Sequence, residues 1–224
     1  MMAARIGLGD VVKSLRKHYG APQIPEPRDP FGIILWENAA YLVDDARRAQ
    51  VYGSLEKDVG LAPAQLLAAG SRRIAAAIRE GGMQPSHRAE KVLRCAEIAV
   101  SYADGELAAA LQGMPLSKAR ALLKRFPGVG DPGADKILLL CGYASLPALE
   151  SNGLRVLERL GFVVQDDAYA RMYRAAVRSL QDAQVDFVDA FALLRQHGRE
   201  LCKRTAPFCQ ACPLRAKCAY ARSR

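Results

Sequence analysis

Four cysteines within a short stretch near the end of the chain constrain its fold more than any other feature of the 224 residues. They follow the spacing C-x6-C-x2-C-x5-C and are Cys202, Cys209, Cys212 and Cys218. Such density requires a shared cause, and four thiolates that bind one metal centre supply it. Two cysteines separated by two residues suit either zinc or an iron–sulfur cluster, because both thiolates reach one centre from a single turn.

Two alternatives to an iron–sulfur cluster remain open from the spacing alone. Disulfide bonds are the weaker one, because cytosolic thiols stay reduced and a chain of this length buries a core without covalent staples. Zinc is the stronger alternative. Zinc sites usually repeat the close pair, whereas this loop has one close pair flanked by single cysteines at unequal distances. The asymmetry favours a [4Fe-4S] cluster, with Zn as the alternative.

The composition indicates a globular protein with a polyanionic partner. Half of the residues are hydrophobic, so the chain can bury a core, and no segment approaches the roughly 20 apolar residues of a membrane helix. We therefore expect a cytoplasmic, nucleoid-associated protein without a membrane partner. The net charge is +9 and the pI is about 9.4, which favours nucleic acid as the partner over a merely soluble basic surface. Residues 199–224 carry +6 of this charge, from seven Lys and Arg residues against Glu200 alone.

Apolar residues recur at helical intervals along most of the chain, and no strand pattern interrupts them. The sequence therefore predicts an all-α fold. Residues 126–140, FPGVGDPGADKILLL, predict a glycine hairpin between two helices, because Gly128 and Gly130 permit positive φ and Pro132 suits a first helical turn. Exposed amides at Gly128, Val129 and Gly130 would bind a DNA phosphate without reading its sequence.

These motifs together resemble the helix-hairpin-helix DNA glycosylase superfamily, closest to its endonuclease III and adenine glycosylase branch. The resemblance is carried by FPGVG, by LPALESNGLRVL, by HGRELC and by the cysteine loop, and it runs from about Asp29 to Tyr220. It implies a two-lobed fold with the active cleft between the lobes. One lobe is a six-helix lobe of residues 30–135 that ends in the helix-hairpin-helix. The other, residues 1–29 plus 136–224, holds a structural or redox-sensing [4Fe-4S] cluster. The cluster loop would present basic residues to the DNA backbone, with Lys203, Arg204, Arg215 and Lys217 as candidates.

The resemblance also identifies the catalytic positions. Bifunctional members have a lysine two residues after GVG, where this chain has Pro132, so the lyase reaction is unsupported. Lys136 lies one helical turn further on the same face, and we expect it to contact DNA phosphate rather than to attack the sugar. The family's catalytic aspartate corresponds to Glu150. A glutamate keeps the carboxylate that stabilises an oxocarbenium-like sugar. Its side chain is one methylene longer than that of aspartate, and a displacement of the carboxylate by about 1 Å can lower the rate about a hundredfold. The alternative for Glu150 is a carboxylate that favours the start of a helix.

The family uses the turn after its first core helix to fill the gap left by an extruded base. This turn reads WENAAYLVDD here, and Tyr41 is the candidate wedge, with Glu37 able to reach the pocket. We expect Trp36 to belong to the core and His197 to support the cysteine lobe.

The sequence therefore predicts a base-excision repair DNA glycosylase that acts as a monomer on double-stranded DNA containing a damaged or mismatched base. It would be monofunctional, hydrolysing the N-glycosidic bond without lysine-dependent lyase activity. One alternative is a DNA-binding, lesion-recognition module of the same fold that does not excise bases. An electron-transfer protein is a second alternative, but it explains neither the hairpin nor the charge.

Overall fold

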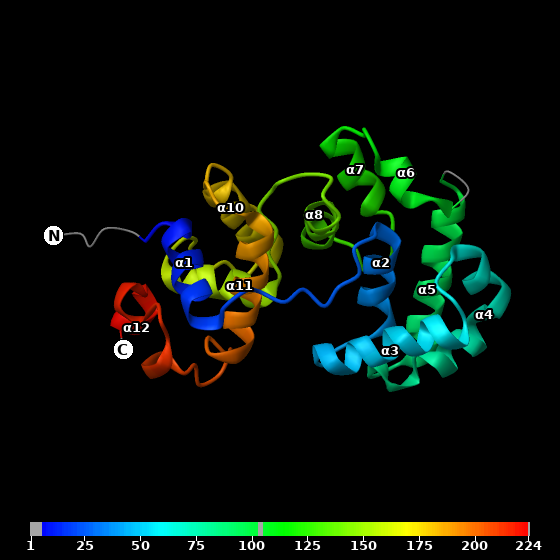
Figure 1. Cartoon of the computed structure of the whole chain (residues 1–224), viewed down its shortest axis with the longest axis horizontal. Coiled ribbons are helices and arrows are strands. Elements are labelled where there is room, and N and C mark those ends of the chain that lie inside the picture. Colours follow the sequence, from blue (N-terminus) through cyan, green and yellow to red (C-terminus); the bar gives the residue numbers. More distant parts are fainter. Residues whose placement is uncertain (1–5, 103–104, 224) are drawn as a thin grey trace. The chain divides into compact units, whose positions relative to one another are not determined.

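Helices make up the regular structure of the part of the chain that the computed structural model describes, residues 6–102 and 105–223 (Figure 1). The all-α prediction is confirmed. None of the helices in these ranges combines the length and the apolar character needed to span a bilayer.

The chain divides into two compact units. The hairpin unit runs from Pro25 to Tyr143, and the cysteine unit joins the segment that ends at Ile24 to the chain from Ala144 onward. These boundaries differ by several residues from the predicted lobe boundaries at residues 30 and 136.

The hairpin unit is built around a helix that is apolar on nearly every side. Helix α2 buries Ile33, Ile34 and Leu35 completely and packs against α3, α5, α6 and α8, as expected for a central helix. Its start is fixed by Asp29, whose side chain accepts a hydrogen bond from the Gly32 amide at 2.6 Å. The elements are α2 (Pro30–Ala39), α3 (Asp45–Asp58), α4 (Pro63–Ala77), η1 (Arg79–Gly81), α5 (Pro85–Val100), α6 (Leu107–Leu111), α7 (Leu116–Leu123) and α8 (Asp131–Leu140).

The cysteine unit combines the first helix of the chain with the last third of the sequence. Helix α11 packs against both α1 and α9, so residues from the two ends of the chain share one core. The elements are α1 (Leu8–Tyr19), α9 (Ser151–Leu160), α10 (Tyr169–Leu180), α11 (Phe187–Glu200), η3 (Cys209–Ala211), η4 (Arg215–Lys217) and α12 (Ala219–Arg222). The four cysteines of the loop follow the end of α11.

Two glycines allow α9 and α11 to approach closely. A Cβ atom on Gly198 would lie only 2.5 Å from the backbone oxygen of Asn152, and a Cβ atom on Gly153 would lie 3.3 Å from the Cβ of Leu194. Only glycine fits at position 198 without moving one of the two backbones. The start of α9 is therefore held against the last turns of α11.

We predict that Gly198→Ala destabilises the protein by about 1–3 kcal/mol, because the new methyl group overlaps the backbone of α9. Gly9→Ala in α1 is the matched control, since a Cβ atom there would have an ordinary 3.8 Å contact with Val185 and alanine favours helix. The free energy of unfolding in urea should fall for the first variant and stay equal or rise for the second. Equal stabilities for the two variants would contradict a tight crossing.

Candidate functional site

The hairpin between α7 and α8 exposes the backbone at two glycines. Gly128 has φ +79°, as predicted, and Gly128 and Gly130 are exposed. The prediction of positive φ for Gly130 is wrong: this residue has φ −95° and is the N-cap of α8. Val129 turns its side chain into the core, and its amide donates to the carbonyl of Phe126 at 3.1 Å. The exposed part of the hairpin therefore consists of the two glycines rather than of all three residues.

A buried amide holds this hairpin on the central helix. The Nδ2 atom of Asn38 donates to the carbonyl of Ile34 at 3.0 Å and to the carbonyl of Pro127 at 2.9 Å. The side chain of Asn38 also fills the space beside Gly128, where a Cβ atom would lie 3.0 Å from its Oδ1. The backbone conformation of the hairpin is thus set by α2 before any ligand binds.

Lys136 does not lie on the surface where a phosphate contact was expected. The residue is buried, and its ammonium group forms an ion pair with the carboxylate of Glu37 on α2. Lys136 follows Asp135, which is also buried and paired with Arg120, so this turn of α8 faces the interior of the hairpin unit. Its assignment as a DNA-binding residue is corrected accordingly. No local sequence pattern indicates this pairing, because the acidic partner comes 99 residues earlier.

Three exposed apolar side chains project from two loops that lie side by side in the hairpin unit. Tyr41 is 56% exposed, Leu42 is 76% exposed and Met83 is 65% exposed. The Tyr41 amide donates to the Gly81 carbonyl at 2.7 Å, which joins the two loops. We call these three side chains the apolar edge. Apolar side chains on a rigid loop can be inserted between the bases of a duplex, which extends the sequence-based choice of Tyr41 to Leu42 and Met83.

A buried arginine fixes the apolar edge from behind. Arg88 donates to the carbonyls of Ile78 at 2.9 Å, Gly82 at 2.9 Å and Met83 at 3.0 Å, and it also donates to the carbonyl of Ala39. One guanidinium group thereby satisfies carbonyls on both loops. Leu42 itself has φ +56°, an uncommon conformation for a side chain of this kind.

The candidate catalytic carboxylate lies at the start of α9. Glu150 is the N-cap residue, but its side chain does not cap the helix. Its Oε1 accepts a hydrogen bond from Asn152 at 2.7 Å, and its Oε2 lies 3.4 Å from the Nε of Arg195 on α11. The Glu150 side chain is 33% exposed, so the carboxylate is held by protein groups and still reaches solvent. The charge of Glu150 also contributes, after desolvation, to a raised pKa of Tyr169 at the start of α10.

A chain of polar contacts runs from this carboxylate to the cysteine loop. Arg155 donates to the Oδ1 of Asn152 at 2.8 Å, which leaves the amide of Asn152 to donate to Glu150. The same guanidinium donates to the carbonyl of Gly198 at 2.7 Å and to the carbonyl of Cys202 at 3.0 Å. The position of Glu150 is therefore tied to the backbone of the first cysteine.

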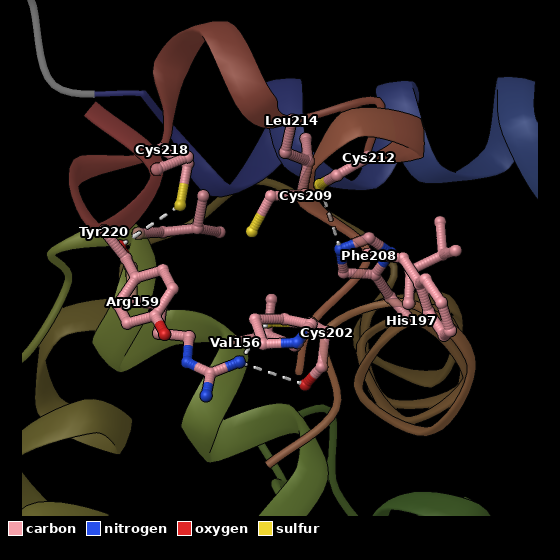
Figure 2. A pocket seen from close by; sticks show the side chains of 14 residues that line it. Val156, Arg159, His197, Cys202, Phe208, Cys209, Cys212, Leu214, Cys218 and Tyr220 are labelled. Atoms are coloured by element: carbon pink, nitrogen blue, oxygen red, sulfur yellow. Dashed lines mark hydrogen bonds between the residues drawn. The ribbon is translucent and has the colours of Figure 1, made fainter. Parts of the chain in front are cut away.

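All four cysteines line one cavity in the cysteine unit, as Figure 2 shows. The cavity encloses about 370 Å³ of empty space, open solvent included, and its other walls are mainly apolar, among them Val156, Leu160 and Leu214. The cysteines are free thiols, which does not support the disulfide alternative. Within the described residues, no three His, Cys, Asp or Glu side chains come close enough together to hold a single metal ion.

Buried polar groups surround this cavity. His197 is 1% exposed, and its Nε2 lies 3.5 Å from the Sγ of Cys212 while its Nδ1 lies 3.0 Å from the hydroxyl of Tyr19 on α1. Burial, with a smaller effect of the nearby His18, lowers the pKa of His197 to about 4, so the ring is neutral near pH 7. His197 thus supports the cysteine unit, as the sequence indicated.

Arg159 on α9 organises the first part of the cysteine loop. It donates to the carbonyls of Lys203 at 2.8 Å and Arg204 at 3.0 Å, and to the Sγ of Cys202 at 3.3 Å. Burial raises the pKa of the Cys202 thiol, and the hydrogen bond from Arg159 opposes that rise. Because their carbonyls are held inside, Lys203 and Arg204 are exposed, in agreement with their expected surface location.

The donor set fits an iron–sulfur cluster. Four soft thiols line one cavity with mainly apolar walls, and Arg159 supplies a hydrogen bond to one sulfur. A group with several metal atoms matches four thiols spread around a cavity, whereas a single zinc ion requires all ligands about 2.3 Å from one point.

Sequence reasoning missed several of these residues. Arg155 and Arg159 stand four residues apart on α9, so their common face could have been inferred from helical spacing. Arg88 and Arg195 gave no comparable signal, because each acts on a segment that only folding brings near.

The hairpin between α7 and α8 and the four-cysteine loop define a helix-hairpin-helix protein with a candidate metal-cluster loop. No protein-family model matches the chain. An endonuclease III from Sulfolobus acidocaldarius is 27% identical over 194 residues, which cover 86% of this chain and 83% of that protein. A thymine-DNA glycosylase from Aeropyrum pernix is 27% identical over 211 residues, which cover 90% of this chain and 88% of that protein.

The fold agrees with these similarities. A solved structure of a non-covalent endonuclease III–DNA complex matches with a TM-score of 0.80 at 20% identity, covering 99% of this chain and 98% of that chain. Sequence similarity over most of the chain and the shared fold place the chain in the helix-hairpin-helix DNA glycosylase superfamily. The resemblance inferred from the motifs is confirmed.

We predict that Arg88→Leu loosens the apolar edge, because it leaves carbonyls of both loops without their donor. Hydrogen exchange at the Tyr41 amide should become at least about tenfold faster, equivalent to a loss of about 1.4 kcal/mol. Arg94→Leu, an exposed position on the same helix, is the control and should leave this exchange unchanged. Equal exchange in the two variants would show that Arg88 does not hold the loops.

Proposed function

We propose that this protein is a monofunctional DNA glycosylase of base-excision repair, which hydrolyses the N-glycosidic bond of a damaged or mismatched base. The observation that carries the proposal is the Glu150 carboxylate, which is held by groups from α9 and α11. The motif resemblance assigns this residue the role of the family's catalytic acid. Its relatives include an endonuclease III and a thymine-DNA glycosylase, which supports glycosylase chemistry.

The reaction needs a negative charge beside the sugar. As the C1′–N bond breaks, its electron pair leaves with the base and the sugar acquires oxocarbenium character, which a fixed carboxylate stabilises. A water molecule then adds to C1′ and gives a proton to Glu150. The released base takes up a proton from solvent, and the strand keeps an intact backbone with an abasic site.

Two observations support hydrolysis without strand cleavage. By the motif resemblance, Pro132 stands where bifunctional members have their lysine, and proline has no side-chain amine. Lys136, the nearest lysine on α8, forms an ion pair with Glu37, and a paired ammonium ion lacks the free electron pair that Schiff-base formation requires.

The surfaces of both units suit a DNA duplex. The hairpin unit offers the exposed backbone at Gly128 and Gly130 for a phosphate and the apolar edge for the gap left by an extruded base. The cysteine unit offers Lys203 and Arg204 for the phosphate backbone. The protein would act as a monomer on chromosomal DNA at the nucleoid.

We also propose that Cys202, Cys209, Cys212 and Cys218 hold a [4Fe-4S] cluster. The cluster would crosslink the end of α11 to the loop that carries Lys203 and Arg204, and its chemistry when bound is structural or redox-active. Two of the four thiols are oriented by other residues of the chain: Arg159 contacts the Sγ of Cys202, and His197 contacts the Sγ of Cys212.

A panel of duplexes with deaminated, oxidised, alkylated and mismatched bases tests the glycosylase proposal. We expect at least one duplex to yield an abasic product that breaks only after alkali is added, and borohydride to trap no covalent complex. Glu150→Gln should lower the single-turnover rate by about 100-fold or more while DNA affinity changes little. Tight, salt-dependent binding without excision of any base would favour the lesion-recognition module instead.

Anaerobic purification tests the cluster. The chain should be yellow-brown and contain about four iron atoms, and Cys209→Ser should lose this absorbance because serine is a poor ligand for iron in such clusters. Cys141→Ser, outside the loop, is the matched control and should keep the colour. A colourless protein that contains one zinc ion would support the zinc alternative.

A further inference from the structure

Arg195 is a largely buried charged side chain that follows three core residues of α11. Its neighbours Ala192, Leu193 and Leu194 belong to the core, and the Arg195 side chain is only 11% exposed. Its Nε lies 3.4 Å from the Oε2 of Glu150, across the crossing of α9 and α11. An arginine is costly to bury unless its charge is matched, so its place on α11 calls for a specific role.

The two oxygens of the Glu150 carboxylate are engaged from different helices. Asn152 on α9 donates to Oε1 at 2.7 Å, and Arg195 on α11 faces Oε2. The other charged or titratable groups near the carboxylate are Arg155 on α9 and Tyr169 on α10, whose pKa responds to the charge of Glu150. A hydrogen bond at one oxygen and an ion-pair contact at the other restrict the orientation of the carboxylate more than either contact alone.

We propose that Arg195 is a positioning residue that fixes the orientation of the Glu150 carboxylate beside the reacting sugar. This inference rests on the proposed glycosylase function and adds a residue to it. A glutamate has one more rotatable bond than an aspartate, and freezing that bond costs conformational entropy. A contact from α11 removes this freedom before DNA binds, so the longer acid can act with the precision that the reaction demands.

The burial of Arg195 distinguishes its pair with Glu150 from surface ion pairs in which the arginine is exposed. In the Arg16–Asp189 pair of the same unit, the arginine side chain is 51% exposed, whereas that of Arg195 is 11% exposed. Exposed pairs exchange their partners with water and hold no fixed geometry. The backbone of α11 near Arg195 is also held against α9 by the close contact of Gly198 with Asn152. The guanidinium group therefore approaches Glu150 from a fixed segment of backbone.

The proposal is tested by removing the guanidinium group of Arg195 and then supplying guanidinium ion in solution. Arg195→Ala should lower the single-turnover excision rate about 10- to 100-fold, with DNA affinity within about twofold of the unmodified chain. Guanidinium ion, well below denaturing concentrations, should restore part of the rate of Arg195→Ala but none of the rate of Glu150→Gln. Arg195→Lys should keep part of the rate, because lysine retains the charge without the planar fork. Arg178→Ala, exposed on α10, is the control and should keep the full rate.

A second measurement does not depend on catalysis. In spectra of the arginine Nε–H groups, the Arg195 signal should shift in Glu150→Gln and stay in place in Arg178→Ala. If no duplex is processed while this shift is present, the glycosylase proposal fails and the pairing stands. The positioning role is overturned if Arg195→Ala keeps the full rate, or if its lost rate does not recover with guanidinium and the signal does not respond to Glu150→Gln.

Discussion

The close crossing of α9 and α11 is the contact on which the cysteine unit depends. Because Gly198 has no side chain, the backbone of Asn152 can lie against it, and the start of α9 is fixed relative to the end of α11. The same crossing brings Arg195 to Glu150 and lets Arg155 reach the carbonyl of Cys202. The candidate catalytic group and the candidate cluster site are thus two ends of one packed interface.

Buried polar side chains fix the functional loops in both units. Asn38 holds the hairpin and Arg88 holds the apolar edge in the hairpin unit, while Arg159 holds the cysteine loop. Each uses side-chain N–H groups to satisfy backbone carbonyls that lie outside regular structure, where an unsatisfied carbonyl would be costly. The exposed groups that would touch DNA are therefore presented on backbone that is already ordered.

Local sequence patterns correctly predicted features that depend only on nearby residues. Positive φ at Gly128 and the core position of Trp36 follow from residue type and neighbours, and the structure agrees. The supporting position of His197 was expected from the family resemblance, and its burial agrees with that expectation. The predictions failed where a distant residue decided the outcome. Lys136 is buried because Glu37, 99 residues earlier, neutralises it. Gly130 differs for a local reason, since it adopts negative φ as the N-cap of α8. The roles assigned to Glu150 and to the four cysteines stay predictions.

The sequence by itself determined the helical class, the four-cysteine loop and the superfamily, because periodicity, ligand spacing and motif order are written along the chain. Only the tertiary structure decided which charges meet. Arg195 approaches Glu150, and Arg88 holds two separate loops, through segments that lie far apart in sequence. Side-chain pairing across a core depends on how helices pack, and that packing is a property of the whole fold rather than of any one segment.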